Sequence, residues 1–114
     1  MNGINVFESQ IITNGSMTGT SVITSSAVNT LRLIAPTIQF VWTGTPNGTF
    51  QIQCSNDGVT WGNVTLSTSI TATGSASDAE INLFPWGFKW FRCTYTNSSS
   101  TGTLNAFFCG KSAG

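Results

Sequence analysis

The stretch that decides the fold is FQIQCSNDGVTW, residues 50–61, near the middle of the chain. Its first half alternates the large apolar residues Phe50 and Ile52 with glutamines, which is the period-two pattern of a half-buried β-strand. Its second half holds three residues whose types tolerate the positive φ values of tight turns: Asn56, Asp57 and Gly58. The stretch therefore predicts a strand, a hairpin turn and the start of a returning strand.

Similar strand patterns continue along all 114 residues. We expect strands over 5–12, 21–24, 30–35, 37–43, 50–54, 61–66, 78–84, 88–95 and 103–109, with one more edge strand around residue 70. Turn residues separate them about every 8 to 12 positions, and no window has the apolar spacing of a helix. The prediction is an all-β, single-domain antiparallel β-sandwich or jelly roll of about eight to nine short strands, with 1–19 as an extended N-terminal arm that turns at Asn14-Gly15.

The strand order suggests how neighbours pair. Strand 37–43 should turn at 45–48 into the strand that begins at Phe50, and 61–66 should complete a three-stranded meander. Strands 88–95 and 103–109 should form a second hairpin. Large residues on both faces of these strands require a second sheet or a neighbouring subunit to cover them. The expected core is Phe40, Trp42, Phe50, Ile52, Trp61, Phe91 and Phe108.

The composition points away from charge-driven functions. Charged residues make up 7% of the chain, against about 25% in typical proteins, and the formal net charge is zero. Thr, Ser and Asn, at 18, 14 and 10 residues, supply hydroxyls and amides in place of charge. Four basic residues cannot neutralise a run of phosphates, so we expect no nucleic-acid partner. A neutral surface of this kind suits a protein that packs against other proteins, although a monomeric domain of biased composition is the simpler alternative.

Titratable groups for catalysis are scarce. The chain has no histidine and four carboxylates, so we expect no enzyme, no cofactor and no metal site. Asp78 and Glu80 would share one face of a strand, which fits glycoside hydrolysis or calcium binding. We favour a third interpretation, in which the two carboxylates discourage pairing at an edge strand.

Cys54, Cys93 and Cys109 all lie in apolar strand patterns. We expect buried free thiols, while one disulfide among the three remains open. We also expect no membrane span and no signal peptide, because the chain lacks a long apolar run and begins without a basic, apolar leader.

Aromatic residues are the enriched candidates for a site. One proline and one glycine, Pro85 and Gly87, interrupt the segment FPWGFKWF (84–91), and Lys89 and Arg92 place charge beside its tryptophans. We expect a subunit interface there, because interfaces favour Trp, Phe and Arg. Its residues would be Trp86, Phe88, Trp90 and Arg92. The alternative is an aromatic platform on which sugar rings or bases stack.

Two family resemblances follow. The segment GTFQIQCSNDGVTWGNV (48–64) resembles the F-x-V-x-x-S-x-D-G-x-x-W signature of discoidin-type galactose-binding-like modules. FKWFRCTY (88–95) and LNAFFCGK (104–111) are similar to the closing strands of those modules. This resemblance implies a jelly-roll sandwich, and it raises glycan or host-receptor binding as an alternative function.

The second resemblance covers 38–111. IQFVWTGTPNGTFQIQCSNDGVTW, followed by INLFPWGFKWFRCTYTNSSSTGTLNAFFCGK, is similar to small structural proteins of tailed and tail-less bacteriophages. It implies a virion component of the minor capsid, decoration or spike-base type, made in the host cytoplasm, with a host-receptor-binding or tail protein as the alternative. Such a protein would act in a symmetric homo-oligomer, a trimer or ring, and contact other virion proteins.

Overall fold

The computed structural model describes residues 4–20, 22–64, 70–73, 77–83, 85–98 and 101–113. These residues form ten β-strands and no helix. In chain order the strands are β1 (Ile4–Ser16), β2 (Val22–Thr24), β3 (Val28–Asn29), β4 (Ile34–Gly44), β5 (Asn47–Ser55), β6 (Gly62–Val64), β7 (Ile70–Thr73), β8 (Ser77–Asn82), β9 (Trp90–Asn97) and β10 (Gly102–Ala113). Within the described ranges, no α-helix has the length and hydropathy that a membrane span needs.

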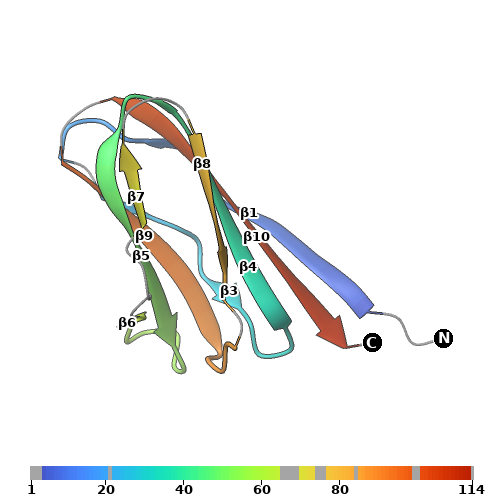
Figure 1. The fold of residues 1–114 in the computed structure, drawn as a ribbon. Helices are drawn as coiled ribbons and strands as arrows, with labels where there is room; N and C mark the ends of the chain where they lie inside the picture. The colour runs from blue at the N-terminus through green and yellow to red at the C-terminus, as the bar shows by residue number, and fades with distance from the viewer. Residues whose placement is uncertain are drawn as a thin grey trace.

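The strands form two antiparallel sheets, as Figure 1 shows. Sheet A has the order β1-β10-β4-β8. Sheet B has the order β2-β9-β5-β6, and β3 and β7 add to β9 and β5 respectively. The expected all-β antiparallel sandwich is therefore confirmed.

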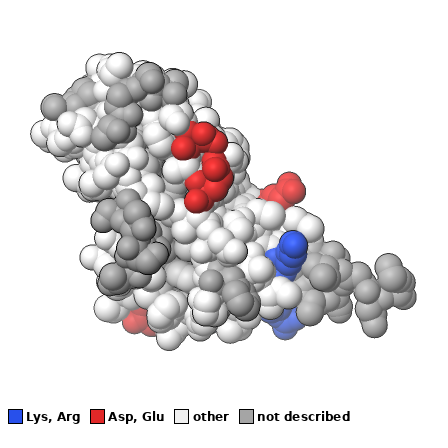
Figure 2. All heavy atoms as spheres, in the orientation of Figure 1, with Lys and Arg blue, Asp and Glu red and all other residues white. Residues whose placement is uncertain are grey.

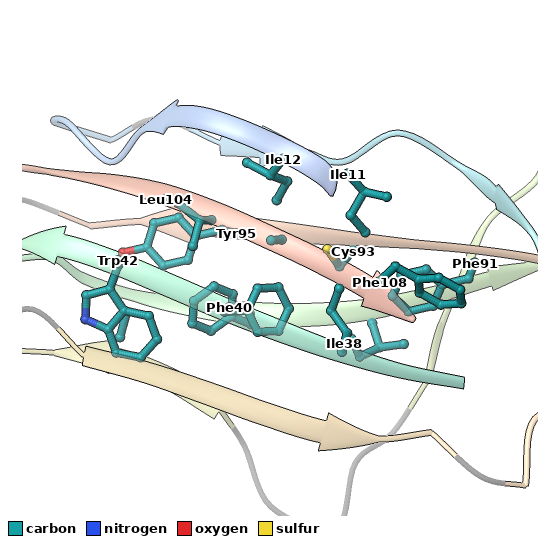
Figure 3. Packing of buried hydrophobic residues seen from close by; sticks show 14 of the residues in the cluster. Ile11, Ile12, Ile38, Phe40, Trp42, Phe91, Cys93, Tyr95, Leu104 and Phe108 are labelled. Atoms are coloured by element: carbon teal, nitrogen blue, oxygen red, sulfur yellow. The ribbon is translucent and has the colours of Figure 1, made fainter. Parts of the chain in front are cut away.

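The core lies between the two sheets, where every second side chain of the long strands points inward (Figure 3). On β9, the buried residues Phe91, Cys93 and Tyr95 alternate with half-buried neighbours. Phe40 of β4 stacks on Phe50 of β5, with ring centroids 4.1 Å apart. These contacts join the two sheets, because β4 belongs to sheet A and β5 to sheet B.

The predicted hairpins between 37–43 and Phe50 and between 88–95 and 103–109 are wrong. In each case the second strand crosses to the opposite sheet: β4 to β5, and β9 to β10. The two links lie side by side, because the Thr45 N–H donates to the Thr101 carbonyl (2.9 Å) and the Ser98 N–H to the Asn47 carbonyl (2.8 Å). A turn signal ends a strand but does not say in which sheet the next strand lies. The predicted return onto the Phe50 strand is confirmed for 62–64, since β6 pairs with β5, and residues 65–66 of that prediction lie outside the described residues.

The sequence predicts strand ends at Asn14-Gly15 and at Pro36, but both positions lie inside strands. Each falls at a β-bulge, where the register with β10 shifts. Asn14 has a φ of 51° and lies where the register of β1 shifts against β10, so Asn14-Gly15 does not end the strand. Pro36 lies in β4 beside Ala35, which has a φ of 51°, where the register with β10 shifts again. A proline is tolerated at such a point because its missing N–H leaves no gap in a regular ladder.

A buried polar network ties the end of β1 to sheet B. The Tyr95 hydroxyl donates to Oδ1 of Asn97 (2.7 Å). Nδ2 of Asn97 in turn donates to the carbonyls of Met17 (3.1 Å) and Gly19 (2.7 Å). Among the described residues, every buried side-chain nitrogen and oxygen has a hydrogen-bond partner. The network therefore holds the connection after β1 without leaving a buried polar group unpaired.

Candidate functional site

The outer face of sheet B carries a connected group of polar and aromatic side chains outside the core. Because Phe91 and Cys93 point inward, Trp90, Arg92 and Thr94 of β9 point to the outside. Antiparallel pairing then fixes their neighbours, since opposed residues share a face. Trp90 lies opposite Ser55 of β5.

The next row on this face runs across three strands. Arg92 of β9 lies opposite Gln53 of β5, and Gln53 lies opposite Asn63 of β6. Nε of Arg92 donates to Oε1 of Gln53 (2.6 Å), and Nε2 of Gln53 donates to Oδ1 of Asn63 (2.9 Å). The Arg92 guanidinium also lies 4.3 Å from the centre of the Trp61 ring, which is a cation–π contact. The row is thus a preorganised chain of amide and guanidinium groups beside an indole.

Trp61 was expected in the core but is half buried and lies outside the buried cluster. The strand pattern placed it on an apolar face, yet it comes before β6, where its ring meets Arg92 on the outer face. The other six predicted core residues are buried: Phe40, Trp42, Phe50, Ile52, Phe91 and Phe108.

The turn between β5 and β6 is held by its own side chains. The carboxylate of Asp57 accepts hydrogen bonds from the N–H groups of Thr60 (2.7 Å) and Val59 (2.8 Å), and it lies 2.8 Å from the Ser55 hydroxyl. These bonds, first those from Thr60 and Val59, hold the pKa of Asp57 well below its usual range. Asp57 is therefore engaged in the turn, as turn chemistry predicts.

The same turn supports the start of β9. Asn56 accepts a hydrogen bond from the Lys89 N–H (3.0 Å). Gly58 has a φ of 78°, and a Cβ atom there would lie 3.2 Å from Nε1 of Trp90. The turn therefore lies against the start of β9, through the bond from Lys89 to Asn56 and the close approach of Gly58 to Trp90.

The four predicted interface residues separate into two pairs. Trp90 and Arg92 share the outer face of sheet B. Trp86 instead packs on the core, with its ring 5.7 Å from that of Phe91, and its Nε1 donates to the Thr30 hydroxyl (3.0 Å). Phe88 contacts Trp86 edge-on at 5.3 Å and is 39% exposed. The contacts of Trp86 lie within the chain, so its first role is in the fold.

The other candidate reactive groups are the carboxylates of β8 and the three cysteines. Asp78 and Glu80 lie on the exposed face of the edge strand β8, and a hydrogen bond with Asp78 raises the pKa of Glu80. Cys54, Cys93 and Cys109 are free thiols, and burial raises the pKa of Cys93 to about 12. Among the residues that the structure describes, no three Cys, Asp or Glu side chains gather where they could bind a metal ion.

Sequence reasoning missed a second surface, on sheet A. A shallow hollow of about 400 Å³ lies where β1 meets β10 and is lined by Glu8, Ser9, Gln10, Phe107, Phe108 and Cys109. Nearby, Val6 is 57% exposed and Phe7 is 41% exposed. Large residues on both faces of 103–109 were the signal that could have indicated this surface.

Known proteins resemble this chain in fold and not in sequence. No protein-family model matches the chain, and no similar curated protein was found. The crystal structure of the PBSX exported protein XepA superposes with a TM-score of 0.61 at 16% identity, over 95% of this chain and 37% of that chain. A chain of infectious bursal disease virus, Gx strain, has a TM-score of 0.62 at 12% identity, over 95% of this chain and 32% of that chain.

The SPBc2 prophage-derived protein YomS is similar over almost its full length. Its TM-score is 0.54 at 10% identity, over 98% of this chain and 97% of that chain. The chain thus spans 37% and 32% of the two longer structures. At these identities the likeness shows a shared β-sandwich fold alone, and the structural neighbours include phage-derived proteins and a viral protein.

Proposed function

We propose that this chain is a non-enzymatic structural component of a bacteriophage virion, of the minor capsid, decoration or spike-base type. It acts through protein–protein contacts in a symmetric oligomer. The observation that carries the proposal is apolar exposure on a surface with few charges. Eight large apolar side chains of the described residues are at least 39% exposed: Val6, Phe7, Val22, Leu31, Ile34, Val59, Phe88 and Phe107.

Such a surface gains free energy by leaving water and has little net charge to keep copies apart. The face visible in Figure 2 is mostly uncharged, with an acidic group over β8. The partners are copies of the chain and other virion proteins, and the place of action is the virion. The phage-derived proteins among the structural neighbours support this choice of particle.

Sedimentation velocity across a wide concentration range tests the proposal directly. We expect a closed oligomer of fixed stoichiometry, and mass spectrometry of purified particles should find the chain at a constant copy number. Arg92→Ala should weaken self-association while the chain stays folded, and Thr96→Ala, on an exposed position of the same strand, is the matched control. A monomer at every concentration that is also absent from particles would contradict the proposal.

A second candidate function is binding of a neutral glycan on the outer face of sheet B. The row of Arg92, Gln53 and Asn63 beside Trp61 favours it, because aligned polar groups and an indole suit the hydroxyls and the apolar face of a sugar ring. Titration of neutral oligosaccharides, followed by tryptophan fluorescence, measures such binding. Gln53→Ala should then weaken it and Thr96→Ala should not, whereas unchanged fluorescence with every sugar would exclude this function.

A further inference from the structure

The N-terminal half of β1 is an open sheet edge. β1 lies at the outer edge of sheet A, with β10 on its other side (Figure 1). From Ile11 onward the following segment covers this edge, since the Ser26 N–H donates to the Ile11 carbonyl (3.1 Å). A Cβ atom on Gly15 would similarly lie 3.0 Å from Ile23. No strand of the described residues pairs with the free side of residues 4–10.

This edge lacks the protection that the opposite edge of sheet A has. β8 carries Asp78 and Glu80 on its exposed face, and such charges discourage pairing with another chain. The open part of β1 has one charged residue, Glu8, beside the exposed Val6 and Phe7. A long edge with exposed apolar residues is a template for an added strand.

We propose that residues 4–10 pair antiparallel with the same residues of a second copy, across a two-fold axis perpendicular to sheet A. The two four-stranded sheets then become one continuous sheet. This inference rests on the self-association proposed above and names a second contact surface for it, on sheet A and separate from the outer face of sheet B around Arg92. A two-fold contact of this kind is self-complementary, because each copy offers the same segment.

The midpoint of the open segment sets the register. Residues 4–10 centre on Phe7, so each Phe7 lies opposite Phe7 of the second copy, an aromatic cross-strand pair. Phe7 belongs to the inner face of sheet A, where its ring lies 6.1 Å from that of Phe108. The pairing therefore continues the aromatic packing of the core from one copy to the next.

Charge favours the same register on the outer face. Val6 lies beside Lys111 of β10, and in this register it also lies opposite Glu8 of the second copy. One strand, β1, then separates each Lys111 from Glu8 of the second copy, so their Cα atoms are about 10 Å apart. The two long side chains together can span that distance. A register centred on Glu8 would instead oppose two like charges, which is destabilising.

Disulfide trapping tests the register. Phe7→Cys, in a Cys54→Ser and Cys109→Ser background, should form a covalent dimer on mild oxidation. Directly opposed residues of an antiparallel pair have Cα atoms about 4.5–5.5 Å apart, within reach of a disulfide. Val6→Cys and Glu8→Cys are matched controls, because neither lies opposite itself. Each control alone should stay monomeric on a non-reducing gel, and their mixture should form the heterodimer.

Charge exchange gives a second, reversible measurement. Glu8→Lys or Lys111→Glu should raise the dissociation constant up to about 25-fold, since two symmetric pairs are lost, each worth up to about fivefold. The two substitutions together should restore association. Two results would overturn the edge pairing and leave the proposed function standing. In the first, all three cysteine variants form a covalent dimer equally well. In the second, Phe7→Cys forms no covalent dimer although the unmodified chain self-associates. A chain that is monomeric at every concentration would overturn the edge pairing, and one that is also absent from purified particles would overturn both proposals.

Discussion

Replacing Gly48 by alanine should destabilise the fold through one methyl group. Gly48 of β5 lies opposite Asn97 of β9, and a Cβ atom at this position would overlap the Thr96 carbonyl oxygen and the Tyr95 hydroxyl. Neither group has room to move, because Thr96 is part of a paired strand and Tyr95 is fully buried and hydrogen-bonded to Asn97. The strands must therefore separate locally, or the buried tyrosine must leave its partner.

The cost can be worked out from these contacts. Overpacking of a well-filled interior costs about 1–3 kcal/mol, and weakening the buried hydrogen bond adds about 1 kcal/mol. A loss of about 3 kcal/mol, with an unfolding entropy of about 2.1 cal/mol/K per residue over 114 residues, lowers the melting temperature by roughly 12 °C. Thermal unfolding followed by circular dichroism, with urea unfolding by tryptophan fluorescence, measures the change.

Gly62→Ala is the matched control. Gly62 lies in the edge strand β6, and nothing lies within 4 Å of a Cβ atom built there. This substitution should be neutral or should stabilise by up to about 1 kcal/mol, because it reduces the entropy of the unfolded chain. If Gly48→Ala melts within about 3 °C of Gly62→Ala, the close approach of β5 and β9 does not restrict this position and the reasoning fails.

Three further outcomes are expected. Arg92→Ala should lower the free energy of unfolding by about 1 kcal/mol, because the cation–π contact and a hydrogen bond are lost. It should lower the free energy of self-association by more, about 2 kcal/mol, if Arg92 anchors an interface. Equal losses in urea unfolding and in sedimentation would argue against an interface role. The pKa of Asp57 is lower in the fold than in the unfolded chain, so its stabilisation is complete above about pH 5 and is lost progressively as the pH falls below that. The urea midpoint of Asp57→Asn should consequently fall less steeply between about pH 5 and pH 2 than that of the unmodified chain. Cys93, with its pKa raised to about 12, should resist iodoacetamide at pH 8 in the native state and react in 8 M urea; rapid native labelling would show that the core opens readily.

The positions of the strands could be predicted from local patterns, but their partners could not. Alternation around Phe50 and Phe91 fixes which side chains are buried, because a strand has a period of two. It does not decide whether the next strand lies beside the first or across the core. Here the links from β4 to β5 and from β9 to β10 both cross between the sheets, and the evidence lies in contacts between residues far apart in sequence, such as Thr45 with Thr101.

The candidate site could be predicted in part for the same reason. Trp90 and Arg92 were identified as surface residues from the charges and breaks around them. Their neighbours Gln53 and Asn63 could not be chosen, because a glutamine on a strand looks the same whether or not its partner strand supplies an arginine. The open edge of β1 depends on which strand stays unpaired, and that is a property of the whole sheet.

The order of strands in sheet A also constrains how the chain reaches this state. β10 lies between β1 and β4, so β1 has no partner in sheet A until a segment more than eighty positions later is present. The hydrogen bond between Gln10 and Asn105 joins residues that are 95 positions apart. Closing so long a loop is slow compared with local hairpin formation. During synthesis on the ribosome the side of β1 that faces β10 therefore stays without its partner strand until residues 102–113 have been made, and a chaperone that shields this side would prevent its pairing with another chain.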